Sequence, residues 1–161
     1  MNYETLVPVI GIIQNISQSP NNCCNQTITI NTPNGVNNFV LSPSTVVVDS
    51  TQLRSGMPVA AFYDSSLPVP LIYPPQYQAE LITILQNDET VALGFFRRNL
   101  TASDNSLRLN LSRSTRILTL NGQRYSCPPG GNFLLVYYSV TTRSIPPQTT
   151  PRKIVVLCGG Q

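Results

Sequence analysis

The sequence predicts an all-β protein made of two tandem, internally repeated modules of about five short strands each, resembling an OB-like barrel or a sandwich. Three observations lead to this prediction. The chain of 161 residues contains 14 prolines, which are tolerated at strand ends and edges but expelled from helix interiors. No stretch of about 10 to 15 residues keeps a helical periodicity free of Pro and Gly. Landmarks of the first half return in the same order in the second half, which indicates an internal duplication.

The first module is expected to cover residues 1–85 and to begin with an N-terminal strand. The expected strands are residues 6–16 with a bend at Gly11, residues 26–31, residues 39–49 interrupted near Pro43, the run ending in Phe62-Tyr63, and the run after Pro74-Pro75-Gln76. Residues 17–25, with Cys23 and Cys24, are expected to form a loop. Asn34-Gly35 predicts a hairpin with a type I′ turn, because both central residues of that turn have positive φ.

The second module is expected to cover residues 86–161, with a cysteine in its C-terminal tail. Gly94 takes the place of Gly11, LSRST at residues 111–115 matches LSPST at residues 41–45, and Tyr137-Tyr138 followed by Pro146-Pro147-Gln148 matches the aromatic pair and Pro-Pro-Gln of the first module. The loop between the last two landmarks is shorter in this copy. The alternative to duplication is a chance resemblance between β-rich stretches.

Charged residues make up 11% of the chain, against about 25% in an ordinary globular protein. Hydrophobic content of 41% is enough for a core, so we expect a folded protein with a neutral polar exterior. Such a surface repels its own copies weakly, which favours self-association. The net charge is +3, and Arg97-Arg98 and residues 108–116 are the only basic concentrations, which fall short of the dense basic face of a nucleic-acid-binding protein. No nucleic-acid partner is therefore expected.

The chain has no histidine, which excludes Ser-His and Cys-His nucleophile systems and histidine-containing metal sites. Asp49 and Asp64 stand at strand ends, but the second module lacks acidic counterparts, so turn-capping is favoured over a glycosidase-like carboxylate pair. Gly130-Gly131 and Gly159-Gly160 lack the Lys-Ser/Thr and helix start of a phosphate-binding loop. We expect no enzyme activity and no cofactor.

The four cysteines are Cys23, Cys24, Cys127 and Cys158. A zinc site is disfavoured because the cysteines form one adjacent pair and two singletons, and neighbouring side chains of an extended chain point in opposite directions. Disulfides are preferred over free thiols, with the pairing open and with bridges between subunits favoured for some of them. Disulfides imply an oxidising setting, so we expect an extracellular, spore-surface or cell-surface location.

Residues 1–13 make a poor signal peptide, and no apolar stretch of about 18 residues predicts a membrane span. Release on lysis of the producing cell is one route to the outside.

The exposed aromatic and apolar residues are the expected contact surface. Tyr73 and Tyr77 flank Pro74-Pro75 and serve either subunit contacts or a stacking platform for sugars, while core packing is preferred for Phe62 and Tyr137. The candidates for subunit contact are Leu6, Val7, Val9, Ile10, Tyr73, Pro74, Pro75 and Tyr77.

Residues 56–77 (GMPVAAFYDSSLPVPLIYPPQY) and 141–148 (TTRSIPPQ) carry a resemblance to small β proteins of spore-forming Firmicutes, especially clostridia, that are often surface-associated. The arrangement of two adjacent cysteines and one cysteine near the C-terminus is similar to that of disulfide-bonded spore appendage subunits. The resemblance implies a structural subunit that polymerises or coats a surface, with itself as partner and disulfides through the four cysteines. The alternative hypothesis is a monomeric OB-like binding module for a glycan, a peptide or a small ligand.

Overall fold

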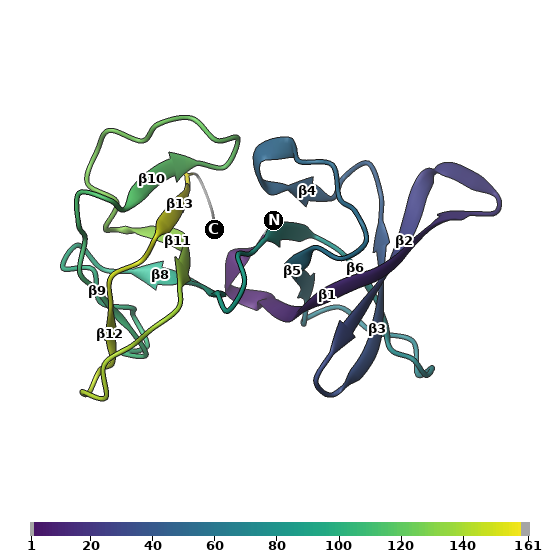
Figure 1. Cartoon of the computed structure of the whole chain (residues 1–161), viewed down its shortest axis with the longest axis horizontal. Coiled ribbons are helices and arrows are strands. Elements are labelled where there is room, and N and C mark those ends of the chain that lie inside the picture. Colours follow the sequence, from purple (N-terminus) through teal and green to yellow (C-terminus); the bar gives the residue numbers. More distant parts are fainter. Residues whose placement is uncertain (1, 159–161) are drawn as a thin grey trace. The chain divides into compact units, whose positions relative to one another are not determined.

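The computed structural model describes residues 2–158. In this part of the chain the regular elements are β-strands and two 3-10 helices, without an α-helix, so the predicted all-β class is confirmed. The chain divides into two compact units, coloured differently along the sequence in Figure 1. The first unit is residues 5–87; the second unit is residues 88–158 together with residues 2–4.

The first unit contains a seven-stranded sheet with the order β4-β7-β5-β1-β2-β3-β6. Most neighbours are antiparallel, but β3 pairs with β6 and β4 pairs with β7 in parallel. The elements in chain order are β1 (Leu6–Ser19), β2 (Asn22–Thr32), β3 (Gly35–Leu41), β4 (Val46–Val47), the 3-10 helix η2 (Val48–Ser50), β5 (Pro58–Asp64), β6 (Gln76–Gln78) and β7 (Leu81–Ile84).

The second unit contains a four-stranded sheet with the order β10-β13-β11-β8 and a two-stranded sheet of β12 and β9. The pairs β10-β13 and β9-β12 are parallel. The strands are β8 (Thr90–Phe96), β9 (Arg108–Leu109), β10 (Arg116–Thr119), β11 (Asn132–Tyr138), β12 (Gln148–Thr149) and β13 (Lys153–Leu157); the 3-10 helix η1 (Tyr3–Thr5) precedes β1.

The two units pair their strands in corresponding registers. Gly11 of β1 lies opposite Val59 of β5, and Gly94 of β8 lies opposite Leu134 of β11, so the two glycines occupy matching positions. The strand that follows Pro-Pro-Gln also begins alike: the amide of Asn38 donates to the carbonyl oxygen of Pro75, and the amide of Arg108 donates to that of Pro147, both at 2.9 Å. The landmark order of the sequence is therefore matched by strand pairing.

The LSPST and LSRST segments form the same hydrogen-bonded turn. In the first unit the Oγ1 of Thr45 accepts from the amide of Ser42 at 3.0 Å and donates to the carbonyl oxygen of Ala79 at 2.8 Å. In the second unit the Oγ1 of Thr115 accepts from the amide of Ser112 at 3.2 Å and donates to the carbonyl oxygen of Pro151 at 2.7 Å. One threonine hydroxyl thus ties each turn to the chain just before the last strand of its unit.

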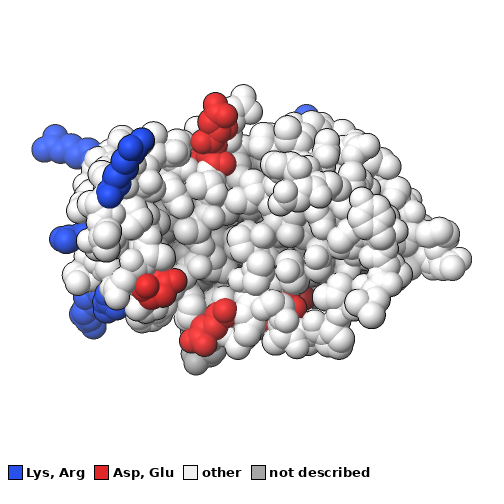
Figure 2. Space-filling view, turned by 90° about the horizontal axis from the view of Figure 1, so that it is seen from below, with Lys and Arg blue, Asp and Glu red and all other residues white. Residues whose placement is uncertain are grey.

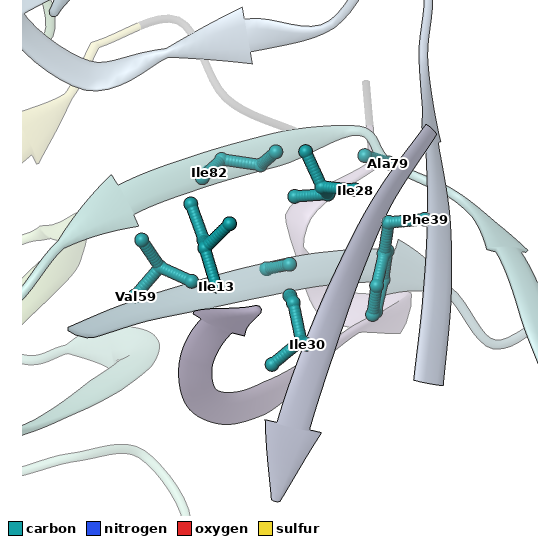
Figure 3. Close-up of a cluster of buried hydrophobic side chains, with 8 residues drawn as sticks. Ile13, Ile28, Ile30, Phe39, Val59, Ala79 and Ile82 are labelled. Carbon is teal, nitrogen blue, oxygen red and sulfur yellow. The ribbon is translucent and has the colours of Figure 1, made fainter. Parts of the chain in front are cut away.

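Each unit has its own apolar core. Figure 3 shows the core of the first unit, where side chains from five strands and from the β6–β7 junction point toward one another. The alternating residues of β2 supply Ile28 and Ile30, both fully buried, as the Thr-Ile alternation predicted. The cluster of the first unit is Ile13, Ile28, Ile30, Phe39, Val59, Ala61, Ala79 and Ile82, and that of the second is Phe96, Ala102, Leu107, Leu109, Leu134, Val136, Ile154 and Val156.

Two local predictions were wrong. Cys23 and Cys24 lie inside β2 and not in a loop, because β1 and β2 continue their pairing as far as Ser19 and Asn22. The hairpin at Asn34-Gly35 exists, but Thr32 pairs with Gly35, so Pro33 and Asn34 are the turn residues. Proline excludes the positive φ that a type I′ turn needs at its first central position, and only Gly35 has a positive φ, of 124°.

Gly11 and Gly94 hold matching positions but differ in their surroundings, which makes them a matched pair for mutation. A Cβ added to Gly11 would overlap the carbonyl oxygen of Asn31 and come within 2.7 Å of Ile30 Cγ2, whereas at Gly94 the nearest atom, on Phe96, is 3.9 Å away. We expect Gly11→Ala to lower the free energy of unfolding by about 1 to 3 kcal/mol. Gly94→Ala should change it by less than about 1 kcal/mol. Urea unfolding of both variants tests this, and equal losses would contradict the close approach of β1 and β2.

Candidate functional site

Each unit has a surface groove at a corresponding place, beside the loop that leads into Pro-Pro-Gln. The first groove encloses about 240 Å³ and the second about 530 Å³. Tyr63 and Gln76 line the first groove, and Tyr138 and Gln148 line the second. These residues belong to the aromatic pair and the Pro-Pro-Gln segment of each copy, so the strongest repeated features of the sequence converge on one kind of site.

The first groove has an aromatic wall. The rings of Tyr63 and Tyr77 are stacked, with centroids 4.0 Å apart and planes inclined by 16°, and Phe39 lies behind Tyr77 at 5.3 Å. Burial, with a smaller contribution from Tyr77, raises the pKa of Tyr63. Leu67, Pro68, Val69 and Pro70 also line this groove. The aromatic rings therefore pack on one another beside a proline-rich segment of the same unit.

The second groove is more polar and more open. Its loop is shorter and supplies Val140, Thr141 and Thr142, without the proline-rich wall of the first groove. The side-chain Nδ2 of Asn110 donates to Gln148 Oε1 at 3.0 Å, and both residues line this groove. Tyr138 is half-buried, and this burial raises its pKa. Hydroxyls, amides, one tyrosine and one arginine form a lining of the kind that binds polar ligands.

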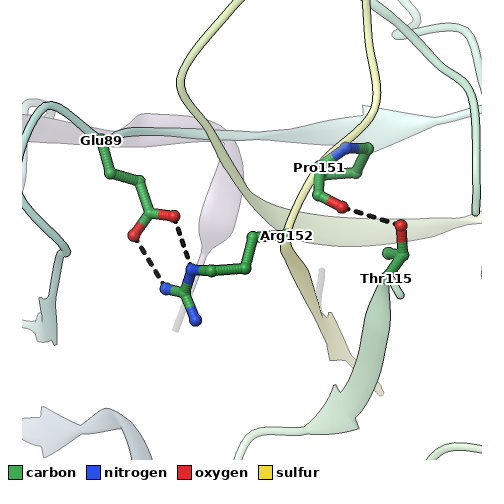
Figure 4. A network of polar contacts seen from close by, with 4 residues as sticks. All are labelled: Glu89, Thr115, Pro151 and Arg152. Atoms are coloured by element: carbon green, nitrogen blue, oxygen red, sulfur yellow. Dashed lines mark hydrogen bonds and ion pairs between the residues drawn. The ribbon is translucent and has the colours of Figure 1, made fainter.

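The arginine of the second groove, Arg152, is held by a buried carboxylate. Figure 4 shows its Nε donating to Glu89 Oε2 at 2.7 Å and its Nη2 donating to Glu89 Oε1 at 2.8 Å. The side chain of Glu89 is 2% exposed and that of Arg152 is 31% exposed. The hydrogen bond to Glu89 raises the pKa of Arg152, so the guanidinium remains charged. When β1 of the first unit is aligned with β8 of the second by strand register, Leu6 corresponds to Glu89. The first unit therefore has no carboxylate at this position, and the ion pair is a feature of the second unit.

The predicted contact residues divide between the core and the surface. Leu6 is buried, Val9 packs against the core of the first unit, and Tyr77 packs on Tyr63, so these three side chains are engaged inside their own unit. Pro74 and Pro75 are half-buried, as is Ile10, and Val7 is 36% exposed. Tyr73 is 87% exposed and precedes the cis-proline Pro74.

An exposed apolar tip next to Tyr73 was missed as a contact candidate. Leu71 is fully exposed and Ile72 is 54% exposed, and in the second unit Ile145, which also precedes a cis-proline, is 99% exposed. The signal in the sequence is the apolar run between the prolines of residues 68–75.

All four cysteines are exposed. Cys23 and Cys24 lie near the end of the β1–β2 hairpin, Cys127 lies in the connection between β10 and β11, and Cys158 follows β13. Cysteine is ordinarily among the most buried residue types, so it is unusual that all four cysteines of this chain are exposed.

The carboxylates show turn chemistry. Asp64 Oδ1 accepts from the amide and the hydroxyl of Ser66 at 3.0 and 2.7 Å, which lowers the pKa of Asp64, as expected for a turn-capping aspartate. Asp104 makes the same contacts with Ser106. Asp49 lies in η2. Within residues 2–158, no group of three or more Cys, Asp or Glu side chains is arranged to hold a metal ion.

No protein-family model matches this chain, and neither a curated protein nor a solved structure matches it. In the described part of the chain, no helix is long and apolar enough to span a membrane.

The Glu89–Arg152 pair allows a test of what holds the second groove together. Arg152→Ala leaves a buried carboxylate without its cation and should lower the free energy of unfolding by roughly 3 to 5 kcal/mol at neutral pH. Glu89→Gln leaves a guanidinium that water can reach, so we expect a loss of about 1 kcal/mol. Urea unfolding measures both. The loss in Arg152→Ala should shrink as the pH falls and the carboxyl protonates; equal, pH-independent losses would contradict this account.

Proposed function

We propose that this chain is a structural subunit that assembles with its own copies at a spore or cell surface and is cross-linked by disulfides. The observation that supports this most is the exposure of all four cysteines on a chain in which only 11% of the residues are charged. Exposed thiols contribute nothing to a core, but they can be reached by the thiols of another copy.

The positions of the cysteines suit cross-linking between copies. Cys23 and Cys24 lie on the β1–β2 hairpin of the first unit, and Cys127 and Cys158 belong to the second unit. Each unit thus carries two of the four cysteines. A link from the hairpin of one copy to the second unit of the next would be heterologous, and such links extend into an open filament unless the rotation between copies closes a ring.

The exposed apolar loop tips support the same proposal. Leu71, Tyr73 and Ile145 offer apolar surface that a single copy leaves in water. Contacts at these tips would hold copies together before the disulfides form, and the low charge of the chain keeps electrostatic repulsion between copies small.

Oxidation of the purified chain followed by electrophoresis tests the proposal. Wild type, oxidised with a glutathione redox buffer, should give a ladder of oligomers without reductant and one monomer band with reductant. The double variants C23S/C24S and C127S/C158S should both abolish the ladder, because a link from the hairpin of one copy to the second unit of the next needs cysteines in both units. Circular dichroism controls for folding, which exposed Cys→Ser changes should not alter. Monomer alone in every lane of the wild type would refute cross-linking between copies.

A binding module for a glycan or another polar ligand is the second candidate, and the corresponding grooves favour it. Strand pairing supports an OB-like interpretation of the first unit: β6 and β7 stand at or near opposite ends of the sheet order, yet only Ala79 and Glu80 separate them in the chain. The backbone amide of Ala79 donates to the carbonyl oxygen of Val40 in β3, and that of Glu80 donates to the carbonyl oxygen of Phe62 in β5. OB-like barrels commonly bind oligosaccharides on a strand face next to such loops.

Light scattering and tyrosine fluorescence separate the two candidates. A stable monomer whose tyrosine emission is quenched by a polysaccharide, with the quenching lost in Tyr138→Ala, would favour the binding module over the structural subunit.

A further inference from the structure

The two units differ sharply in charge. Nine of the ten Lys and Arg residues lie in the second unit, with four acidic residues, which gives this unit a side-chain charge of +5. The first unit has Arg54 and three acidic residues, a side-chain charge of −2. Figure 2 shows most of the blue side chains gathered over the second unit. The chain's modest net charge of +3 conceals this division.

Most of this positive charge is free to meet a ligand. Arg152 is paired with Glu89, and Lys153 is buried with its Nζ 4.5 Å from the centroid of the Tyr137 ring. The seven other basic residues of the second unit are all exposed arginines: Arg97, Arg98, Arg108, Arg113, Arg116, Arg124 and Arg143. The exposed acidic residues of the unit number only three, Glu4, Asp88 and Asp104.

Two of these arginines line one groove along β10, an edge strand of the four-stranded sheet. This arginine groove has a volume of about 370 Å³ and is lined by Thr115, Arg116, Ile117, Leu118, Arg124 and Tyr125. Within the described residues, the guanidinium groups of Arg116 and Arg124 make no hydrogen bond or ion pair. Two unpaired guanidinium groups beside one hollow repel each other, and a bound anion would remove that repulsion.

Arg116 and Arg113 are not needed by the scaffold that carries them. The threonine turns and the parallel pairs β4-β7 and β10-β13 align the two units with each other. In this alignment Val46 of the first unit corresponds to Arg116, and Pro43 corresponds to Arg113. The same turn and the same strand pairing therefore form without a positive charge. A feature that one copy has and the fold does not require points to a ligand of that copy.

We propose that the arginine groove of the second unit binds phosphate groups of a linear polyanion. A guanidinium fork takes both oxygens of a carboxylate, whereas a tetrahedral phosphate offers oxygens to two guanidiniums at once, which fits Arg116 and Arg124 on one groove. A chain with repeated phosphates would also reach the other exposed arginines. Tyr125, which is half-buried in the groove, offers a ring on which a nucleobase can stack if the polyanion is a single-stranded nucleic acid.

Fluorescence anisotropy of the full chain with labelled probes tests the proposal. The probes are polyphosphate, a single-stranded oligothymidylate, the same oligomer without bases, and polyglutamate as the carboxylate control. We expect binding to the phosphate probes that weakens with added salt, and much weaker binding to polyglutamate. If the oligothymidylate and the oligomer without bases bind equally, the protein contacts the phosphates alone. If the oligothymidylate binds more tightly, the natural polyanion is a single-stranded nucleic acid.

Matched double variants distinguish the groove from diffuse charge. R116Q/R124Q should lower the affinity at least tenfold at low salt. It should also reduce the slope of the logarithm of the binding constant against the logarithm of the salt concentration by about one to two. R54Q/R143Q removes the same charge, one arginine from each unit and neither in the groove, and should change the affinity by no more than about threefold. Circular dichroism confirms that both fold. Absence of binding to every phosphate probe, equal binding of polyglutamate, or equal losses in the two double variants would overturn the proposal.

Discussion

The structure of each unit depends on one segment, the chain that follows Pro-Pro-Gln. In the first unit this segment pairs with β3 through β6, and with both β4 and β5 through β7. In the second unit the corresponding segment pairs with β9 through β12, and with β10 and β11 through β13. Its last strand in the second unit, β13, is buried at all five residues. Because one segment bonds to three strands that are distant in sequence, the turn, the core and the grooves all take their positions from it.

The two units share this scaffold and differ in their surface residues. The threonine turn, the matching glycines and both parallel pairs occur twice. The residues around them differ by copy: a proline-rich wall fills one groove and a shorter loop opens the other. Leu6 in one copy corresponds to Glu89 in the other, and Val46 corresponds to Arg116. Such divergence allows one unit to be nearly neutral and apolar at its loop tip while the other is basic.

The two proposals use different parts of this surface and are compatible. Assembly would use the thiols and the apolar loop tips, while phosphate binding would use β10 and its arginines. A subunit that both polymerises and holds a polyanion would coat an anionic surface.

The sequence by itself determined the all-β class, the order of the landmarks and the positions of the repeated turn, because these follow from local backbone preferences of Pro, Gly, Thr and β-branched residues. It failed where the register and extent of strand pairing decide the outcome. Continued pairing with β1 drew Cys23 and Cys24 into a strand, and the register of β2 with β3 moved the turn to Pro33-Asn34. The buried Glu89–Arg152 pair joins residues 63 positions apart, beyond the reach of any local pattern. Charge counted over the whole chain also hid the arginine groove: the predicted modules already divide the charges unequally, but only the tertiary structure brings Arg116 and Arg124 to one hollow.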